Sequence, residues 1–393
     1  MAGWQAKAFH SKRIALADAR QLLGFDPRLH AVSLNWQIIY ENRAYKMISK
    51  LSLPRIFVLA LLASIATVFL LAGCAISSVP ALVPAPAPAP VDSWLSTLDI
   101  NHVLVGKIWA VKQQRWISEA DLNGELASKR FILLGETHDN LDHHRLQLAI
   151  LNAMTQQRAS TRVVAMEQFD IDNQAAIDAA MMLPNPTADA IADAGKLDRK
   201  GWGWDQYRPI VDFAILQKLR LRAANLSRGD GRQIFSLGLK ASPVKFADEF
   251  FTNTWNTPRN NALQEELLEG HCGQLPDSMA SGMGNVQRAR DAIMAGAMLA
   301  AKPSGAVLIA GRGHVRRDRA VPLYLQTVAP NSEIAVVAFI EVVAAQTSPR
   351  DYIDSIVNEA EPFDYVWFTP RVARKDPCEG ISLSGLKPTA DMK

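Results

Sequence analysis

Short apolar runs alternate with amphipathic stretches along the chain from about residue 100 onward. The run FILL at residues 131–134 is apolar at every position, which is typical of a strand buried on both faces of a parallel sheet. Amphipathic helices fit between such runs and can cover both faces. The pattern predicts an α/β fold, with a mainly parallel open sheet flanked by helices. The predicted strands cover residues 130–136, 162–169, 233–239, 306–313, 333–342 and 365–369.

Residues 240–302 have a mostly helical pattern and are long for a single connection between two strands. We therefore expect a helical insertion in this region, and we expect it to cap the C-terminal ends of the strands.

A different pattern precedes this domain. The segment MISKLSLPRIFVLALLASIATVFLLAGC begins at Met47 with two basic residues, continues with eighteen mostly apolar residues and ends at Cys74. This order is typical of a secretory signal, and LLAGC resembles the lipobox of bacterial lipoproteins, in which the cysteine is lipidated. A transmembrane anchor is the alternative interpretation. We expect an upstream, untranslated extension at 1–46, a signal peptide at 47–73 and lipidation of Cys74.

The segment PALVPAPAPAP at residues 80–90 favours extended polyproline II, a semi-rigid spacer of about 3 Å per residue. The sequence therefore predicts a lipidated N-terminus and linker at 74–95, followed by the α/β domain at 96–385. Ala75 directly after the cysteine resembles the pattern of lipoproteins sent to the outer membrane. We expect the domain to be anchored there by lipid and to face the periplasm.

The net charge of +3 comes from the N-terminal region. Residues 1–73 hold nine Lys and Arg against three Asp and Glu, whereas residues 74–393 hold 33 against 36. Charge therefore gives no indication of nucleic-acid binding.

Two cysteines, Cys272 and Cys378, follow the lipobox. In an oxidising periplasm two such thiols can pair in a disulfide. Two independently buried thiols are the alternative.

Polar residues follow two of the predicted strands at matched spacing. Gly135, Glu136 and His138 come at the end of one strand, and Gly311 and His314 repeat the G-x-x-H spacing at the end of another. Glu167 lies near the end of a third strand. Because open α/β sheets bind ligands beyond the carboxyl ends of their strands, these side chains are the candidate functional residues. A structural, hydrogen-bonded role for each histidine is the alternative.

His143 and His144 lie in the first turns of the next predicted helix, and consecutive helical residues point in different directions. His144 shares a face with two leucines and is expected in the core. His143 shares a face with Gln147 and is expected to be solvated.

Six blocks of the sequence, in this order, resemble the ChaN-like haem-binding lipoproteins, whose wider superfamily includes Tiki-type metalloproteases and erythromycin-esterase-like hydrolases. The resemblance covers residues 100–380 and departs from the family at Lys240 and Ala241, where the family typically has asparagine and proline. The six blocks are LLGETHDNLDHHRLQL, GWGWDQYRPIVDFA, GHCGQLP, QRARDAIMA, LIAGRGHVRRDRAVPLYL and YVWFTPR followed by DPCEG.

The resemblance implies that haem is the ligand, and a haem site needs an axial ligand, an apolar wall and cations for the two propionates. The GWGWDQYRP loop supplies Trp202, Trp204 and Tyr207, with Arg208 alongside. We expect Tyr207 to ligate the iron, since phenolate suits ferric haem that is stored or passed on. A core aromatic cluster is the alternative. The candidates for propionate contacts or a second ligand are His138, His314, Arg145 and Arg312.

The competing hypothesis is a metal-dependent hydrolase. Glu136, His138, Glu167 and His314 could hold Zn or Mn, or act as a general base on water. We favour a non-enzymatic lipoprotein that binds haem in iron uptake. An outer-membrane haem receptor or a periplasmic haem carrier would be its partner, and a homodimer is compatible with the sequence.

Overall fold

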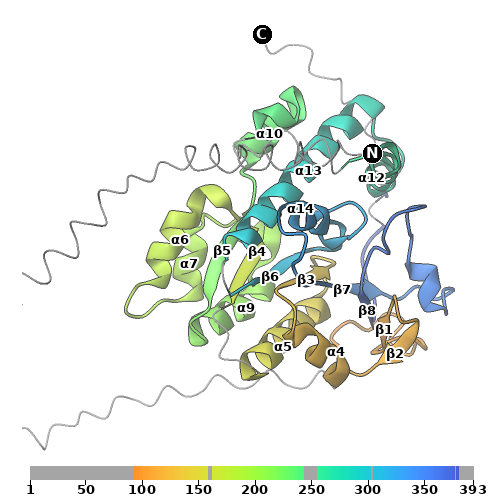
Figure 1. Ribbon diagram of the computed structural model, residues 1–393, viewed down its shortest axis with the longest axis horizontal. Coiled ribbons are helices and arrows are strands. Elements are labelled where there is room, and N and C mark those ends of the chain that lie inside the picture. The colour runs from red at the N-terminus through yellow and green to blue at the C-terminus, as the bar shows by residue number, and fades with distance from the viewer. Residues whose placement is uncertain (1–92, 158–161, 243–254, 302–303, 377, 380–393) are drawn as a thin grey trace, which may run out of the picture. The chain divides into compact units, whose positions relative to one another are not determined.

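The computed structural model describes residues 93–379, apart from 158–161, 243–254, 302–303 and 377. Their centre is an eight-stranded sheet in the order β2-β1-β8-β7-β3-β6-β4-β5 (Figure 1). Every pairing among β3 to β8 is parallel, and β1 is antiparallel to both of its neighbours. The predicted mainly parallel sheet is therefore confirmed. The strands are β1 Ile108–Ala110, β2 Arg115–Ile117, β3 Phe131–Glu136, β4 Val163–Asp170, β5 Arg220–Asn225, β6 Ala306–Gly311, β7 Ile334–Glu341 and β8 Tyr365–Thr369.

The central strands are apolar at successive positions because helices cover both faces of the sheet. Ile132 and Leu134 of β3 belong to one core cluster, whereas Phe131 and Leu133 belong to the cluster on the other face. This alternation follows from the two-residue period of a strand.

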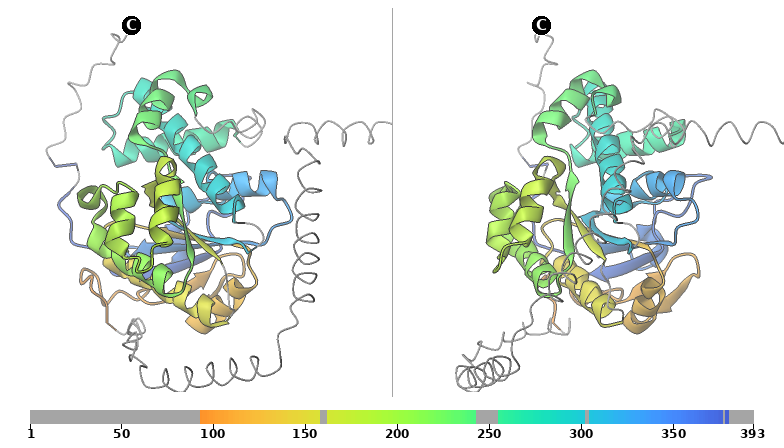
Figure 2. Two further views of the ribbon diagram at one scale, coloured as in Figure 1. Left: turned by 90° about the vertical axis from the view of Figure 1, so that its left-hand side faces the viewer. Right: turned by 60° about the vertical axis from the view of Figure 1, so that its left-hand side comes forward.

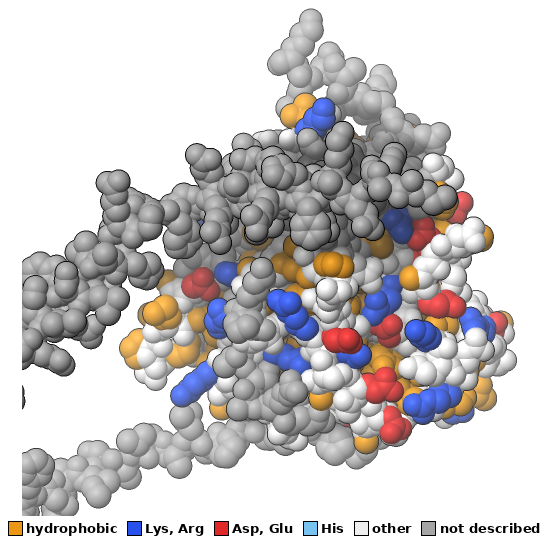
Figure 3. All heavy atoms as spheres, in the orientation of Figure 1, with side chains coloured by type: hydrophobic (Ala, Val, Ile, Leu, Met, Phe, Trp, Pro, Cys, Tyr) orange, Lys and Arg blue, Asp and Glu red, His pale blue; other side chains and the backbone are white. Residues whose placement is uncertain are grey.

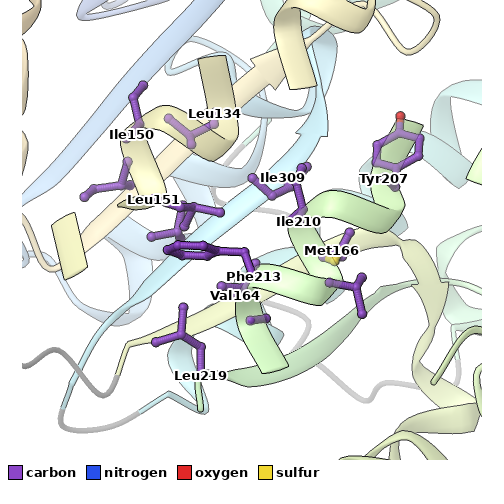
Figure 4. Close-up of a cluster of buried hydrophobic side chains, with 14 of the residues drawn as sticks. Leu134, Ile150, Leu151, Val164, Met166, Tyr207, Ile210, Phe213, Leu219 and Ile309 are labelled. Carbon is purple, nitrogen blue, oxygen red and sulfur yellow. The ribbon is translucent and has the colours of Figure 1, made fainter. Parts of the chain in front are cut away.

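Helices α4 to α9 contribute to the first core cluster, which Figure 4 shows between α5, α9 and the central strands. Helices α13 and α14 cover the opposite face, and Figure 2 shows the two helical layers on either side of the strands. The first group is α4 Glu119–Ala127, α5 Leu141–Gln157, α6 Gln174–Met181, α7 Ala188–Ala194, α8 Arg199–Trp202 and α9 Trp204–Leu216. The others are α10 Arg228–Leu237, α12 Thr257–Gly270, α13 Asp277–Leu299 and α14 Val321–Val328. Four 3-10 helices complete the described elements: η2 Ile171–Asn173, η3 Leu239–Ala241, η4 Arg312–Val315 and η5 Pro349–Tyr352.

The strand predicted at 233–239 is wrong, because this segment ends α10 and continues into η3. The third parallel strand of the chain is β5 instead, whose arginines hide its strand pattern. Ser227 caps α10 by accepting a hydrogen bond from the Asp230 amide, and Gly238 ends the helix with a φ of 80°. A Ser cap before the segment and a glycine after it are helix boundary signals, and they outweigh the local apolar run.

The helical region predicted at 240–302 contains α12 and α13, while residues 243–254 lie outside the described residues. Helix α13 packs on the sheet as the crossover to β6. Helix α12 lies beyond the C-terminal ends of the strands, where Glu266 pairs with Arg319 of the loop that follows β6. The cap is therefore formed by α12, whereas α13 belongs to a helical layer.

Cys272 and Cys378 form a disulfide with a Cα–Cα distance of 5.7 Å. It joins the segment after α12 to the C-terminal segment, 106 residues away.

The predicted signal peptide, Cys74 and the proline-rich linker lie outside the described residues. Within the described part of the chain, no helix is long and apolar enough to span a membrane. Figure 3 shows Lys and Arg side chains interspersed with Asp and Glu on the face that it draws.

Candidate functional site

The C-terminal ends of β3, β6 and β4 lie side by side at one edge of the sheet. Glu136, the last residue of β3, is level with Gly311, the last residue of β6. Glu167 lies in the C-terminal half of β4, on the other side of β6. The parallel register therefore brings the two G-x-x-H motifs and the third strand together.

Glu136 is the central buried group, with 2% of the residue exposed. Its Oε1 atom accepts a hydrogen bond from the Tyr207 hydroxyl at 2.5 Å and lies 3.0 Å from His138 Nδ1. Its Oε2 atom accepts a hydrogen bond from the Gln147 amide at 2.7 Å and lies 3.2 Å from His144 Nδ1. Both oxygens thus have partners, which a buried carboxylate requires.

Glu167 connects the two histidines of the G-x-x-H motifs. Its Oε2 atom accepts a hydrogen bond from the Gly311 amide at 2.8 Å and lies 4.0 Å from His138 Nε2. Its Oε1 atom lies 3.5 Å from His314 Nε2, and His314 Nδ1 lies 2.6 Å from Asp291 Oδ1. Carboxylates and imidazoles therefore alternate from Asp291 on α13 to Glu136 on β3.

The two glycines leave room for this arrangement. A Cβ atom on Gly311 would lie 2.8 Å from His138 Nε2, and one on Gly135 would lie 2.3 Å from Val315 Cγ2. Both distances are shorter than real Cβ contacts. The glycine in each motif is therefore required by close packing beside the site.

His138 carries a positive charge at neutral pH. Burial opposes its protonation, but the hydrogen bond to Glu136 and the charge of Glu167 raise the pKa of His138 to about 9. Burial also disfavours the carboxylate of Glu136, yet the charge of His144 and the hydrogen bond of His138 hold its pKa well below the usual range. Since 46% of the His138 side chain is exposed, the site presents a cation to solvent over a buried carboxylate.

Asp291 and His314 form a second, buried ion pair. Burial raises the pKa of Asp291 to about 6, although the charge of His314 opposes the shift. Burial lowers the pKa of His314, but the charges of Glu167 and Asp291 outweigh it and the net shift is upward. His314 is 8% exposed and lies at a cavity of about 220 Å³ between α12, α13 and η4.

The prediction that His143 is solvated is wrong. His143 is fully buried; its Nδ1 accepts a hydrogen bond from the Thr137 amide at 2.9 Å, and its Nε2 lies 2.8 Å from Thr369 Oγ1. Burial holds its pKa well below the usual range, so it is a neutral structural residue. His144 is buried as predicted, but it also contacts Glu136 and lies 4.3 Å from Tyr207 between ring centroids. Helix α5 begins directly after the β3 end, so its first turn faces the site.

Tyr207 lies in this cluster as a buried hydrogen-bond donor. The residue is fully buried in the core that Figure 4 shows, and its hydroxyl donates to Glu136. Burial and the Glu136 charge raise the pKa of the phenol above its ordinary value. In this arrangement Tyr207 is protonated, and its oxygen faces the carboxylate.

The tryptophans of the same loop have different positions. The Trp202 ring lies 5.2 Å from the His138 ring in an edge-on arrangement and is half-buried. Trp204 is 5% exposed, and its Nε1 donates a hydrogen bond to Asp189 at 2.9 Å. Of the two tryptophans predicted from the sequence, Trp202 therefore lies beside the exposed imidazole, and Trp204 is buried.

The two predicted arginines do not join the cluster of Glu136 and His138. Arg145 binds the Ser93 carbonyl at 2.7 Å and Asp142 at 3.1 Å, so it holds the segment before β1 against α5. Arg312 begins η4 and lines a different cavity, of about 770 Å³.

Sequence reasoning missed Asp291, Gln147 and Gln168 as parts of the site. Gln147 and Gln168 donate to opposite oxygens of Glu136, and Asp291 orients His314. Asp291 could have been found from the sequence, because it is a carboxylate beside the small and apolar residues AIMAGA of a helix, where a charged side chain is expected to have a buried partner. Within the residues that the structure describes, no three His, Cys, Asp or Glu side chains are arranged to hold a metal ion.

Comparison with protein families gives a match over residues 122–325 to a family described as haem-binding uptake, Tiki superfamily, ChaN. No curated protein matches the chain. One similar solved structure is described as cofacial heme binding to ChaN of Campylobacter jejuni. It is 24% identical in sequence, with a TM-score of 0.54, and the aligned region covers 66% of this chain and 95% of the C. jejuni chain. An erythromycin esterase in its open conformation has a TM-score of 0.33 and 14% identity, with 72% and 84% covered.

Proposed function

Because the chain belongs to the ChaN family of haem-binding uptake proteins in the Tiki superfamily, we propose that it binds haem and takes part in haem uptake. The exposed, positively charged His138 beside Trp202 carries the proposal for the site. A haem contributes two propionates and a flat apolar ring, which require a cation and an apolar wall. His138 supplies the cation, and the Trp202 ring supplies part of the wall.

The described residues meet these two requirements, but the iron ligand needs a separate argument. Tyr207 as the axial ligand stays a prediction. In the described arrangement its hydroxyl is buried and donates to Glu136, so ligation would require loss of that hydrogen bond and of the phenolic proton. Rings of His144 and Trp202 also lie within 6.3 Å of the Tyr207 ring. We therefore assign the first haem contacts to His138 and Trp202.

The predicted location follows from the sequence. The predicted signal peptide at 47–73, followed directly by Cys74, supports a lipoprotein, and we propose outer-membrane anchoring towards the periplasm. The Cys74→Ala variant should accumulate as an unprocessed precursor, which mass spectrometry of the membrane fraction detects. A wild-type protein that retains residues 47–73 would contradict this part of the proposal.

The C. jejuni structure is described by cofacial haem binding to that protein. Cofacial haems face each other, and two copies of one chain could each supply a haem-binding face. We propose that a homodimer is the haem-bound form here. Light scattering with and without hemin measures the mass, and the haem absorbance gives the number of haems per chain.

The proposed site is tested by titrating hemin into the full chain in detergent. His138→Gln removes the charge but keeps a polar side chain, and Trp202→Leu removes the ring. Each variant should weaken hemin binding by about tenfold, because one charge-assisted hydrogen bond or one buried aromatic ring contributes about that much to affinity. His102→Gln, far from the cluster in sequence and with no shared contacts, is the matched control. If wild-type protein does not bind hemin with a defined stoichiometry, the proposed function is wrong.

The metal-dependent hydrolase receives less support. Glu136 and Glu167 are already paired with histidines and a backbone amide. The test adds Zn or Mn to the same protein and measures binding by calorimetry. Tight binding of either ion that His138→Gln abolishes would favour the hydrolase.

A further inference from the structure

A large polar cavity lies beside the proposed haem site and has no role in it. Its volume is about 770 Å³, within the range of small-molecule sites. Helix α12, the loop of η4 and the segment that follows β7 line it. Like the site at His138, it lies beyond the C-terminal ends of the parallel strands, where open α/β sheets bind ligands.

Two of the three arginines in this cavity are neutralised by carboxylates. Arg316 binds Asp318 and Asp354, with bonds of 2.6 to 3.0 Å. Arg319 forms an ion pair with Glu266 of α12. A Cβ atom on Gly313 would lie 3.1 Å from Glu266 Oε1, so α12 packs closely on the η4 loop. Arg319 joins the η4 loop to α12, and Arg316 joins it to the segment after β7; because Arg316 faces two carboxylates, these groups leave no positive charge for a ligand.

Three charged side chains in the cavity have no hydrogen-bond or ion-pair partner among the described residues, whereas the Asp351 carboxylate at its edge accepts a hydrogen bond from the Ser348 amide. Arg312 projects from the η4 wall, and Glu265 and Glu269 stand one turn apart on the α12 wall. None of the three side chains forms a hydrogen bond or ion pair with another residue in the described ranges. Each is at the surface, so water and ions satisfy it in the absence of a ligand. The cavity thus offers one free positive group and two free negative groups.

This charge pattern selects among ligands. A dianionic ligand such as haem would meet one free cation and two free carboxylates, and repulsion between like charges disfavours it. A ligand with one carboxylate and two amino groups matches all three groups. Ile340 and Phe363 add apolar surface to the same cavity.

We infer that this cavity is a second binding site, for a small cationic zwitterion such as a short basic peptide with a free carboxyl terminus. Arg312 binds the carboxylate of the ligand, and Glu265 and Glu269 bind its ammonium groups. Arginine binds carboxylates through two parallel hydrogen bonds, so it distinguishes a free carboxylate from an amide. The haem site at His138 and the peptide site at Arg312 would occupy neighbouring parts of one sheet edge.

The probe is the tripeptide Ala-Lys-Ala with free termini, which carries one carboxylate and two ammonium groups. Isothermal titration calorimetry with the full chain in detergent compares it with the C-terminally amidated and the N-acetylated tripeptides. Wild-type protein should bind the free peptide at least about tenfold more tightly than either derivative, since each loses one charge-assisted contact. Failure to bind the free peptide, or equal binding of free and amidated peptides, would overturn the inference.

Two variants test which residues cause the preference for the free peptide over its amidated and acetylated derivatives. Arg312→Gln should bind the free and the amidated peptide equally, because the carboxylate partner is gone. The double variant Glu265→Gln with Glu269→Gln should bind the free and the acetylated peptide equally. Arg232→Gln, which changes an exposed arginine of α10, is the control and should retain the wild-type discrimination. A loss of discrimination in the control would show that the effect is one of net charge and would contradict the site.

Hemin titration of the same variants separates this inference from the proposed function. Arg312→Gln should bind hemin like wild-type protein, and hemin should not displace the tripeptide. If Arg312→Gln weakens hemin binding tenfold and hemin displaces the tripeptide, the cavity belongs to the haem site and the inference is wrong. If hemin does not bind but the discrimination between peptides holds, the second site stands without the proposed function.

Discussion

Tyr207→Phe is expected to destabilise the protein while leaving the buried ring in place. The change removes one oxygen, and that oxygen donates a hydrogen bond to the Glu136 carboxylate at 2.5 Å. The residue is fully buried, so water cannot replace the lost donor without opening the core. A hydrogen bond to a charged group contributes roughly 1.5–3 kcal/mol. We expect a decrease of that size in the free energy of unfolding.

Urea denaturation of the wild-type and variant full chains, without hemin, measures this difference. Tyr365→Phe is a matched control, because Tyr365 also donates to a glutamate, Glu125, at the other end of the sheet. The side chain of Glu125 is 34% exposed, so water can replace the donor and the loss should stay below about 1 kcal/mol. Equal losses in the two variants would refute the assignment of a special stabilising role to the buried Tyr207 contact.

The same variant tests the proposed iron ligand. A ferric phenolate complex has a charge-transfer absorption band, and Phe cannot form it. If Tyr207 ligates the iron, Tyr207→Phe loses that band and most of its hemin affinity. If hemin spectra and affinity stay as in wild-type protein, the role of Tyr207 is to hold Glu136, and another residue ligates the iron.

Three further outcomes follow from the structure. The pKa of His138 is raised from 6.5 to about 9, so its contribution to stability is complete below pH 6.5 and is lost as pH rises through 9. Because 46% of the side chain is exposed, solvent screening reduces the effect, and we expect the free energy of unfolding to fall by about 1–2 kcal/mol between pH 6 and pH 10. Urea denaturation at the two pH values measures this difference, which His138→Gln should lack. The double variant Cys272→Ser with Cys378→Ser should lose about 4 kcal/mol in the same assay, since the bond closes a loop of about a hundred residues; a loss below about 1 kcal/mol would contradict this. Gly311→Ala places a Cβ atom 2.8 Å from His138 Nε2 and should weaken hemin binding about tenfold with the circular dichroism spectrum unchanged; unchanged affinity would show that the imidazole position does not matter.

The sheet was largely predictable because parallel central strands are apolar on both faces. FILL, AVLI and AVVAF are consecutive apolar runs, and each forms a strand of the structure. The edge strand β5 was missed because its sequence, RLRAAN, alternates with arginines that need no cover at the sheet edge. An apolar run in α10 was taken instead, since a short apolar run fits a strand as well as a helix that packs on one side.

The site residues that lie at strand ends were predictable, because the pairing register of the parallel strands alone determines where they lie. Glu136, His138, Glu167 and His314 follow strand ends, and parallel pairing brings strand ends together whatever the intervening sequence contains. Residues placed by helices were less accessible to this reasoning. Asp291 faces His314 only because α13 packs on the sheet in one rotational setting, and periodicity predicts the buried face of a helix without saying which strand end it meets.

The burial of His143, which was predicted to be solvated, shows that helical geometry alone does not determine exposure. His143 and His144 do point in different directions, but the first turn of α5 is enclosed by β3, β8 and α9, so both directions are buried. His143 is neutral and accepts a hydrogen bond from the Thr137 amide, whereas His144 lies 3.2 Å from Glu136 Oε2, and this carboxylate raises the pKa of His144 against the effect of burial. The difference between a structural and a functional histidine is therefore set by the neighbour that tertiary packing supplies. A carboxylate next to the ring raises its pKa, and of the two imidazoles that contact Glu136 only His138 reaches solvent, which is why the proposed haem contact falls there.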